Sequence, residues 1–212
     1  KVPRIAFVNK MDRVGANFDD CLSQMKEKLG AKAVPFQIPI GQESEFQGVV
    51  DLVSMKAIIW QGEDLGAKLE TREIPADLLE EAKMRREELI EAVSEFDDVL
   101  MEKFIEGNEP SVAEIISAAR KGCVKLGITP VFCGSAFKNK GVQPLLDGVV
   151  NYLPSPIDVG AVHGTDVRNP EKILERKPSA KEPVAALAFK IMTDPFVGHL
   201  TYLRIYSGQI EV

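Results

Sequence analysis

The sequence predicts an α/β fold, in which buried parallel strands alternate with helices, followed by a short all-β region. Two apolar runs without alternation, residues 4–8 and 129–134, each precede a polar turn and a helical pattern. This arrangement is typical of a parallel sheet that is covered on both faces. From Pro183 onward the pattern changes to two strands, residues 184–192 and 200–206, separated by a turn. That change indicates the start of a separate β-structure.

Composition excludes several classes of protein. The 212 residues are 45% hydrophobic and 27% charged, which is ordinary for a folded globular chain. A net charge of −6 makes stand-alone nucleic-acid binding a poor hypothesis, because phosphate contacts need a basic face. Three cysteines without CxxC spacing give no disulfide framework. No apolar run approaches the length of a membrane span, so we expect a cytoplasmic protein without a membrane partner. Both ends fall at strand patterns, so we expect a piece of something larger.

The first predicted helix covers residues 18–29, where apolar side chains recur at helical spacing. Asn17 is a good N-cap and Gly30 suits the C-terminal stop. Residues 34–40 are strand-like, but two prolines remove N–H donors, which favours an edge strand. Further along, the sequence predicts a β-rich stretch, a polar loop, a charged helix and a short helix, at residues 46–60, 62–71, 77–95 and 99–105.

The later elements also carry local signals. Ser111 and Glu114 have the spacing of a capping box and open another helix. Residues 141–153 predict a helix that buries one apolar side: Val142, Leu145, Leu146, Val149 and Leu153. His163 and His199 lie in or beside loops, so we expect surface residues there. The cysteines lie on apolar faces or in a strand, so we expect core thiols.

The candidate binding residues begin at the end of the first strand, with Asn9-Lys10-Met11-Asp12. Ligands bind at the carboxyl ends of strands in open α/β sheets. A carboxylate accepts two hydrogen bonds side by side, so Asp12 suits the paired N1–H and N2–H₂ donors of guanine, which adenine lacks. Asn9 can offer its amide to the acceptor edge of the base and tie its loop to a neighbour. The Lys10 stem can cover the purine face.

A second candidate loop, Gly134-Ser135-Ala136, also follows an apolar strand and precedes a helix. Small residues there would let a backbone N–H approach the O6 atom of guanine. The first loop alone is equally well explained as a plain turn, in which such residues are common, and for Ser135-Ala136 alone a plain turn is the better explanation. Two such loops at two strand ends, in this order, are far more specific than either one.

Together these loops and their surroundings resemble the translational GTPases, and within them the elongation factor G family. The segments that carry the resemblance are NKMDR at 9–13, FQGVVDLVSMKAIIW at 46–60, GSAFKNKGVQPLLDGVVNYLPSP at 134–156 and FKIMTDPFVGHLTYLRIYSG at 189–208. The resemblance implies a partial P-loop GTPase core with an inserted α+β subdomain, followed by the beginning of a β-barrel domain. The implied parts are core at 1–32 and 127–156, insert at 33–126, linker at 157–182 and barrel start at 183–212.

The same resemblance implies a function for the intact parent. Asn9, Lys10 and Asp12 would be the guanine-specificity motif, and Ser135 and Ala136, with Phe137 adjacent, the final guanine-contact motif. The parent would bind GTP and GDP, with Mg²⁺, and hydrolyse GTP to drive movement of tRNA and mRNA through the ribosome. Its insert would dock the stalk protein of the large ribosomal subunit.

The chain departs from the family in one respect that decides its chemistry. It contains no G-x-x-x-x-G-K-[ST] segment, so the phosphate cradle and its Mg²⁺ ligand are absent. We therefore expect no GTP hydrolysis by this chain alone, no catalytic or metal-binding residue within it, and self-association through the apolar edge of the first strand. Two alternatives remain: a protein-interaction module that binds the stalk protein, or a piece of a related factor, such as a tetracycline-resistance ribosome protection protein or a mitochondrial factor.

Overall fold

The computed structural model describes residues 2–60 and 68–211. The chain divides into two compact units, Lys1–Leu153 and Pro154–Val212.

The first unit contains a three-stranded parallel sheet, as the sequence predicts. Its order is β1 (Ala6–Val8), β7 (Thr129–Cys133) and β2 (Ala33–Pro35), so β7 is the central strand. All of β7 is buried, in agreement with its apolar run. The third strand, β2, lies within the range expected for the insert, although it pairs with the sheet of the core.

A second sheet of the same unit is antiparallel. Its strands, in order, are β3 (Gln37–Ile40), β4 (Gly48–Asp51), β5 (Lys56–Trp60) and β6 (Leu69–Arg72). Only Phe36 separates β2 from β3, and each is an edge strand of its own sheet. The edge-strand prediction for residues 34–40 is therefore confirmed.

The strand β6 corrects the loop predicted for residues 62–71. Residues 69–71 belong to this strand, whereas residues 62–67 lie outside the described part of the chain. Every residue of β6 is exposed, and the strand is held by its backbone pairing with β5. An apolar pattern cannot reveal a strand that buries no side chain.

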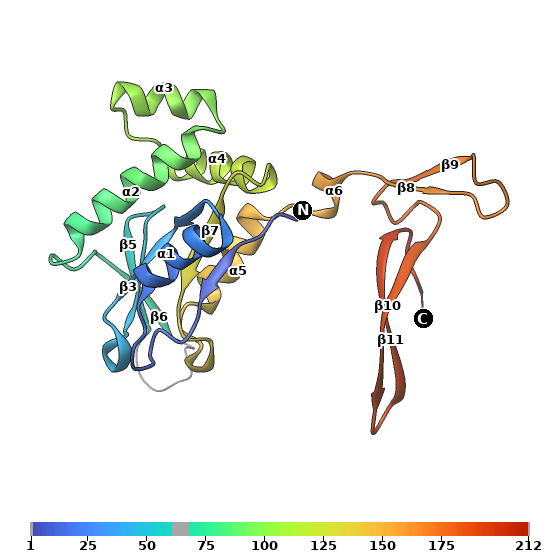
Figure 1. Cartoon of the computed structure of the whole chain (residues 1–212), viewed down its shortest axis with the longest axis horizontal. Helices are drawn as coiled ribbons and strands as arrows, with labels where there is room; N and C mark the ends of the chain where they lie inside the picture. Colours follow the sequence, from blue (N-terminus) through green and yellow to red (C-terminus); the bar gives the residue numbers. More distant parts are fainter. Residues whose placement is uncertain (1, 61–67, 212) are drawn as a thin grey trace. The chain divides into compact units, whose positions relative to one another are not determined.

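The predicted helices are present in the first unit (Figure 1). They are α1 (Phe18–Leu29), α2 (Leu79–Ser94), α3 (Asp98–Glu106), α4 (Val112–Val124) and α5 (Val142–Tyr152), with two 3₁₀ turns, η1 (Glu43–Glu45) and η2 (Ala136–Lys138). Asn17 caps α1 by accepting from Asp20 N at 3.0 Å, and the capping box of Ser111 and Glu114 opens α4. Helices α2, α3 and α4 pack on one another, and α4 also contacts α5 and β7.

The buried side of α5 differs from the prediction. Leu146 and Val149 are exposed, whereas Gly148 and Tyr152 are buried. A Cβ atom on Gly148 would lie 2.5 Å from the Phe132 ring, so glycine allows this side of the helix to approach β7 closely. The close approach, and not the apolar pattern, sets the rotation of the helix.

Three aromatic rings mark the core beside these elements. The Phe36 ring stacks on Phe132 at a centroid distance of 5.9 Å and meets Tyr152 edge-on at 4.9 Å. Burial raises the pKa of the Cys123 and Cys133 thiols, as expected for core cysteines. Cys21 is only half-buried.

The second unit consists of a short helix and two hairpins. These are α6 (Pro156–Val159), β8 (Val162–Thr165) with β9 (Ile173–Arg176), and β10 (Ala185–Asp194) with β11 (Gly198–Ser207). The hairpin β8–β9 falls within residues 157–182, so a loop is the wrong prediction at those strands, and the linker stays a prediction. The hairpin β10–β11 confirms the two later strands. No closed barrel is present among the described residues, and the barrel start stays a prediction.

No described helix of the chain is both long and apolar enough to cross a membrane.

Candidate functional site

Two loops meet where β1 and β7 end. Because the strands are parallel, their carboxyl ends lie at the same edge of the sheet. The backbone joins the loops directly: Gly134 N donates to Val8 O at 3.0 Å, and Met11 N donates to Gly134 O at 3.1 Å. The sheet thus brings together the two sequence motifs that point to guanine.

Asn9 connects the two loops through its side chain. Its Oδ1 atom accepts from Lys10 N at 2.8 Å and from Ala136 N at 2.9 Å, although Asn9 and Ala136 are 127 residues apart. Two backbone donors fix the oxygen of the amide on this side. The Nδ2 group is therefore the part of Asn9 that can meet an acceptor on a ligand.

The Asp12 carboxylate lies between Ser135 and Lys138. Its side chain is only 13% exposed, and its Oδ2 atom is 3.4 Å from Lys138 Nζ. The nearby Ser135 hydroxyl, the main-chain N–H of Asp12 and Lys138 hold the pKa of Asp12 below its usual value, against the opposing effect of burial. The Ser135 hydroxyl itself is buried and makes no hydrogen bond of full geometry within the described part of the chain. At neutral pH Asp12 is thus an ionised, acceptor-only group.

The second loop has a conformation that requires glycine at both ends. Ser135 and Lys140 exchange backbone hydrogen bonds at 2.9 and 3.0 Å, which closes the turn. A Cβ atom on Gly134 would lie 2.3 Å from Lys140 O, and one on Gly141 would lie 2.5 Å from Cys133 O. Gly141 also has a φ of +86°, a region that disfavours other residues. The two glycines therefore fix where Ser135 and Ala136 are presented.

The remaining predicted residues lie at the rim of this site. Lys10 is exposed and has a left-handed φ of 64°, and Phe137 is 92% exposed. The Ala136 N–H already donates to Asn9 Oδ1, so a guanine O6 that approached this N–H would share or displace that hydrogen bond. Sequence reasoning missed Lys138, whose only signal is its place three residues after Ser135.

A hollow of about 250 Å³ borders the first loop on the side of α1. Asn9, Lys10 and Met11 line it, together with the start of α1, but neither Asp12 nor Ser135 does. The described residues contain no cluster of three or more His, Cys, Asp or Glu side chains that could hold a metal ion. The candidate residues of the two loops thus do not share this hollow, because Asp12 and Ser135 lie outside it.

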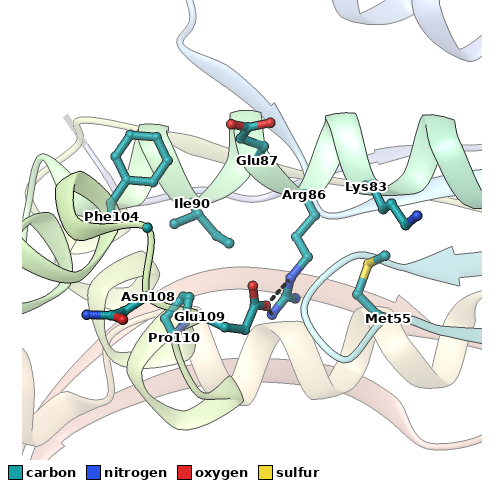
Figure 2. A pocket seen from close by; sticks show the side chains of 10 residues that line it. Met55, Lys83, Arg86, Glu87, Ile90, Phe104, Asn108, Glu109 and Pro110 are labelled. Carbon is teal, nitrogen blue, oxygen red and sulfur yellow. Dashed lines mark hydrogen bonds and ion pairs between the residues drawn. The ribbon is translucent and has the colours of Figure 1, made fainter.

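A separate hollow of about 470 Å³ lies between α2, α3 and the turn that joins β4 to β5 (Figure 2). Figure 2 shows Ile90 and Phe104 on one side of it and Met55 on the other, with the Arg86–Glu109 pair between them. Arg86 closes one wall: it donates to Leu52 O and Val53 O, both at 2.7 Å, and pairs with Glu109 at 2.6 Å. This hollow is far along the chain from the guanine loops and uses none of their residues.

A parallel sheet with two candidate base-recognition loops at its carboxyl edge is the arrangement expected of a GTP-binding type of domain. Residues 1–155 match the family described as the elongation factor Tu GTP binding domain, and the chain belongs to this family. The chain is also similar to elongation factor G of Wolbachia pipientis subsp. Culex pipiens (strain wPip), with 55% identity over 210 residues. That match covers 99% of this chain and 30% of the relative, so the chain spans about a third of the relative's length.

A solved structure supports the same fold. A crystal structure of a protein from Thermus thermophilus aligns with a TM-score of 0.74 and 28% identity, over 97% of this chain and 27% of that one. The predicted α/β class and the resemblance to elongation factor G are confirmed by these matches.

Proposed function

We propose that the chain is the base-recognition part of a longer translational GTPase, which hydrolyses GTP to drive ribosomal translocation of tRNA and mRNA. The observation that carries this proposal is the contact between the two loops. Asn9 Oδ1 binds Ala136 N, and Asp12 lies beside Ser135 at the same sheet edge. The relative's name, elongation factor G, supports the translational role, as it does a cytoplasmic location and a ribosomal partner.

Each residue has a role in this proposal. The ionised Asp12 accepts from the two adjacent N–H groups of guanine, which adenine cannot offer. The Nδ2 group of Asn9 and the backbone of Ser135 and Ala136 serve the acceptor edge of the base. Lys10 and Phe137, both exposed at the rim, cover the faces of the purine.

This chain by itself is expected to bind GTP only weakly and not to hydrolyse it. Phosphoryl transfer depends on positioning and charge around the phosphates and Mg²⁺, and the sequence lacks the segment that cradles them. Base contacts without phosphate contacts give binding of about millimolar strength or weaker. Mg²⁺ and the catalytic groups would come from other parts of the parent.

Titration of this chain with a fluorescent GDP analogue, with an ATP analogue as control, tests that statement. The proposal predicts no saturable binding up to high micromolar concentration and no GTP hydrolysis. Tight and guanine-selective binding would show that phosphate contacts are present within the chain. The proposal that base contacts and phosphate contacts lie in different parts of the parent would then be wrong.

The hollow beside α2 favours a second role, as a docking surface for the ribosomal stalk protein. Its apolar floor, with Ile90 and Phe104, and its exposed rim residues Lys83 and Glu87 suit a protein partner. Reversing both rim charges, with Lys83→Glu and Glu87→Lys, should weaken stalk binding by this chain. Lys26→Glu on α1 is the control, and an equal loss in that variant would contradict this location.

Self-association remains part of the proposal. Strand β1 pairs with β7 along one side, and its other side has no partner strand among the described residues. An unpaired apolar edge can pair with another copy. Light scattering should show growth of the mean particle mass with concentration, and a clean monomer at high concentration would contradict this.

A further inference from the structure

The turn η1 contacts the loop that carries Asp12 at two points. Glu43 N donates to Met11 O at 3.1 Å, and Glu43 Oε1 accepts from Gly15 N at 2.7 Å. These two hydrogen bonds hold the loop on either side of Asp12. One residue of η1, 28 positions away from Gly15 in sequence, thus fixes both ends of the segment that presents the carboxylate.

The left-handed backbone conformation of Glu43 indicates that its side chain is needed at this position. Its φ is 52°, a left-handed conformation that glycine adopts freely and that costs other residues about 1 kcal/mol. A glycine at this position would relieve the strain but could not accept from Gly15 N. Strained residues of this kind persist where the surrounding structure needs them, often beside functional sites.

The same turn also reaches the second loop. Phe46, the residue at the C-terminal end of η1, accepts from Lys140 Nζ at 2.9 Å through its main-chain oxygen. The Lys140 ammonium also lies 6.0 Å from the centre of the Phe46 ring. Glu43 and Phe46 therefore hold both loops of the candidate guanine site from one short segment.

We propose that Glu43 is a positioning residue for guanine selectivity, which sets the place of Asp12 by gripping its loop at Met11 and Gly15. The inference rests on the proposed function, in which Asp12 accepts from N1–H and N2–H₂ of guanine. A displaced Asp12 lowers the affinity for guanine most, because both of its hydrogen bonds to that base are weakened. It lowers the affinity for hypoxanthine less, because that base has only the N1–H donor. The ratio of GDP affinity to IDP affinity therefore reports the placement of Asp12.

The test measures this ratio in the longer protein that we propose contains this chain, for Glu43→Ala, Glu43→Gln and Glu45→Ala. Glu43→Ala removes the acceptor for Gly15, and the ratio should fall by about five- to tenfold, which is the value of one hydrogen bond. Glu43→Gln keeps an acceptor oxygen and should restore most of the ratio. Glu45, an exposed carboxylate in the same turn, provides the matched control and should leave the ratio unchanged.

Amide hydrogen exchange on this chain alone gives a second measurement that needs no nucleotide. Glu43→Ala should speed exchange at Gly15 N–H by about tenfold, whereas Glu45→Ala should not. Selectivity for GDP over IDP in the unaltered protein, together with an unchanged ratio in Glu43→Ala, would overturn the positioning role alone. A ratio near one in the unaltered protein would overturn the proposed function, and the positioning role with it.

Discussion

The two units of the chain differ in what holds their strands. In the described part of the chain, every buried hydrophobic side chain belongs to the first unit, between Met11 and Tyr152. Among the described strands those of the hairpin β10–β11 in the second unit are the longest, yet most of their apolar residues are exposed, with Phe189 at 61% and Ile191 at 72%. A two-stranded hairpin without a buried face is marginally stable. Backbone pairing alone is therefore a weak source of stability, and the candidate site lies in the unit that has a core.

The largest expected contrast between the units comes from truncating one phenylalanine in each. Phe36→Ala removes a ring that packs on Phe132 and Tyr152, and should lower the free energy of unfolding by about 3–5 kcal/mol. Phe189→Ala should change it by less than about 0.5 kcal/mol, because that ring is largely exposed. Urea unfolding measures both, and equal losses would contradict the comparison.

A smaller contrast comes from the capping boxes, since each unit has one. In the first unit, Ser111→Ala removes the acceptor for Glu114 N and should cost about 1 kcal/mol, because α4 is packed into the core. Ser155→Ala removes the same kind of cap from α6, which buries no residue, and should leave the main unfolding transition unchanged. A similar loss from both variants, measured by thermal unfolding, would show that local capping and not burial sets the stability.

The smallest expected effect is a dependence on pH. Lys103 and the hydroxyl and N–H of Ser111 lower the pKa of Glu114 from its ordinary value of 4.5 to about 2. A carboxyl whose pKa is lower in the folded state adds stability above pH 4.5, and this contribution is lost as the pH falls toward 2. The free energy of unfolding, measured in urea at several pH values across this window, should depend less steeply on pH for Glu114→Gln than for the unaltered chain. An identical slope in both proteins would contradict the assignment.

Much of the arrangement of the candidate site could be predicted because its signals are local. Asn9, Asp12 and Ser135 each follow an apolar strand and precede a helix, so the topology of a parallel sheet brings them to one edge. The N-terminal caps of α1 and α4 could also be predicted from the sequence, because a cap depends on residues three positions apart.

The parts that could not be predicted depend on distant contacts. The strand β6 exists through pairing with β5 and has no apolar pattern. The rotation of α5 follows from the approach of Gly148 to Phe132, which no helical periodicity reveals. The hydrogen bond between Gly15 N and Glu43 Oε1 joins two residues that no sequence pattern connects.

The central claim is that Asp12 reads guanine, and a change of base tests it most directly. In the longer protein that we propose contains this chain, Asp12→Asn should weaken GDP binding by about a hundredfold or more, because an amide cannot accept from both N–H groups. The same variant should prefer xanthosine diphosphate, whose extra carbonyl can accept from the new amide. Glu45→Gln provides an exposed control with the same change of charge. An unchanged preference for GDP over xanthosine diphosphate in Asp12→Asn would contradict the assignment of Asp12 and the site built around it.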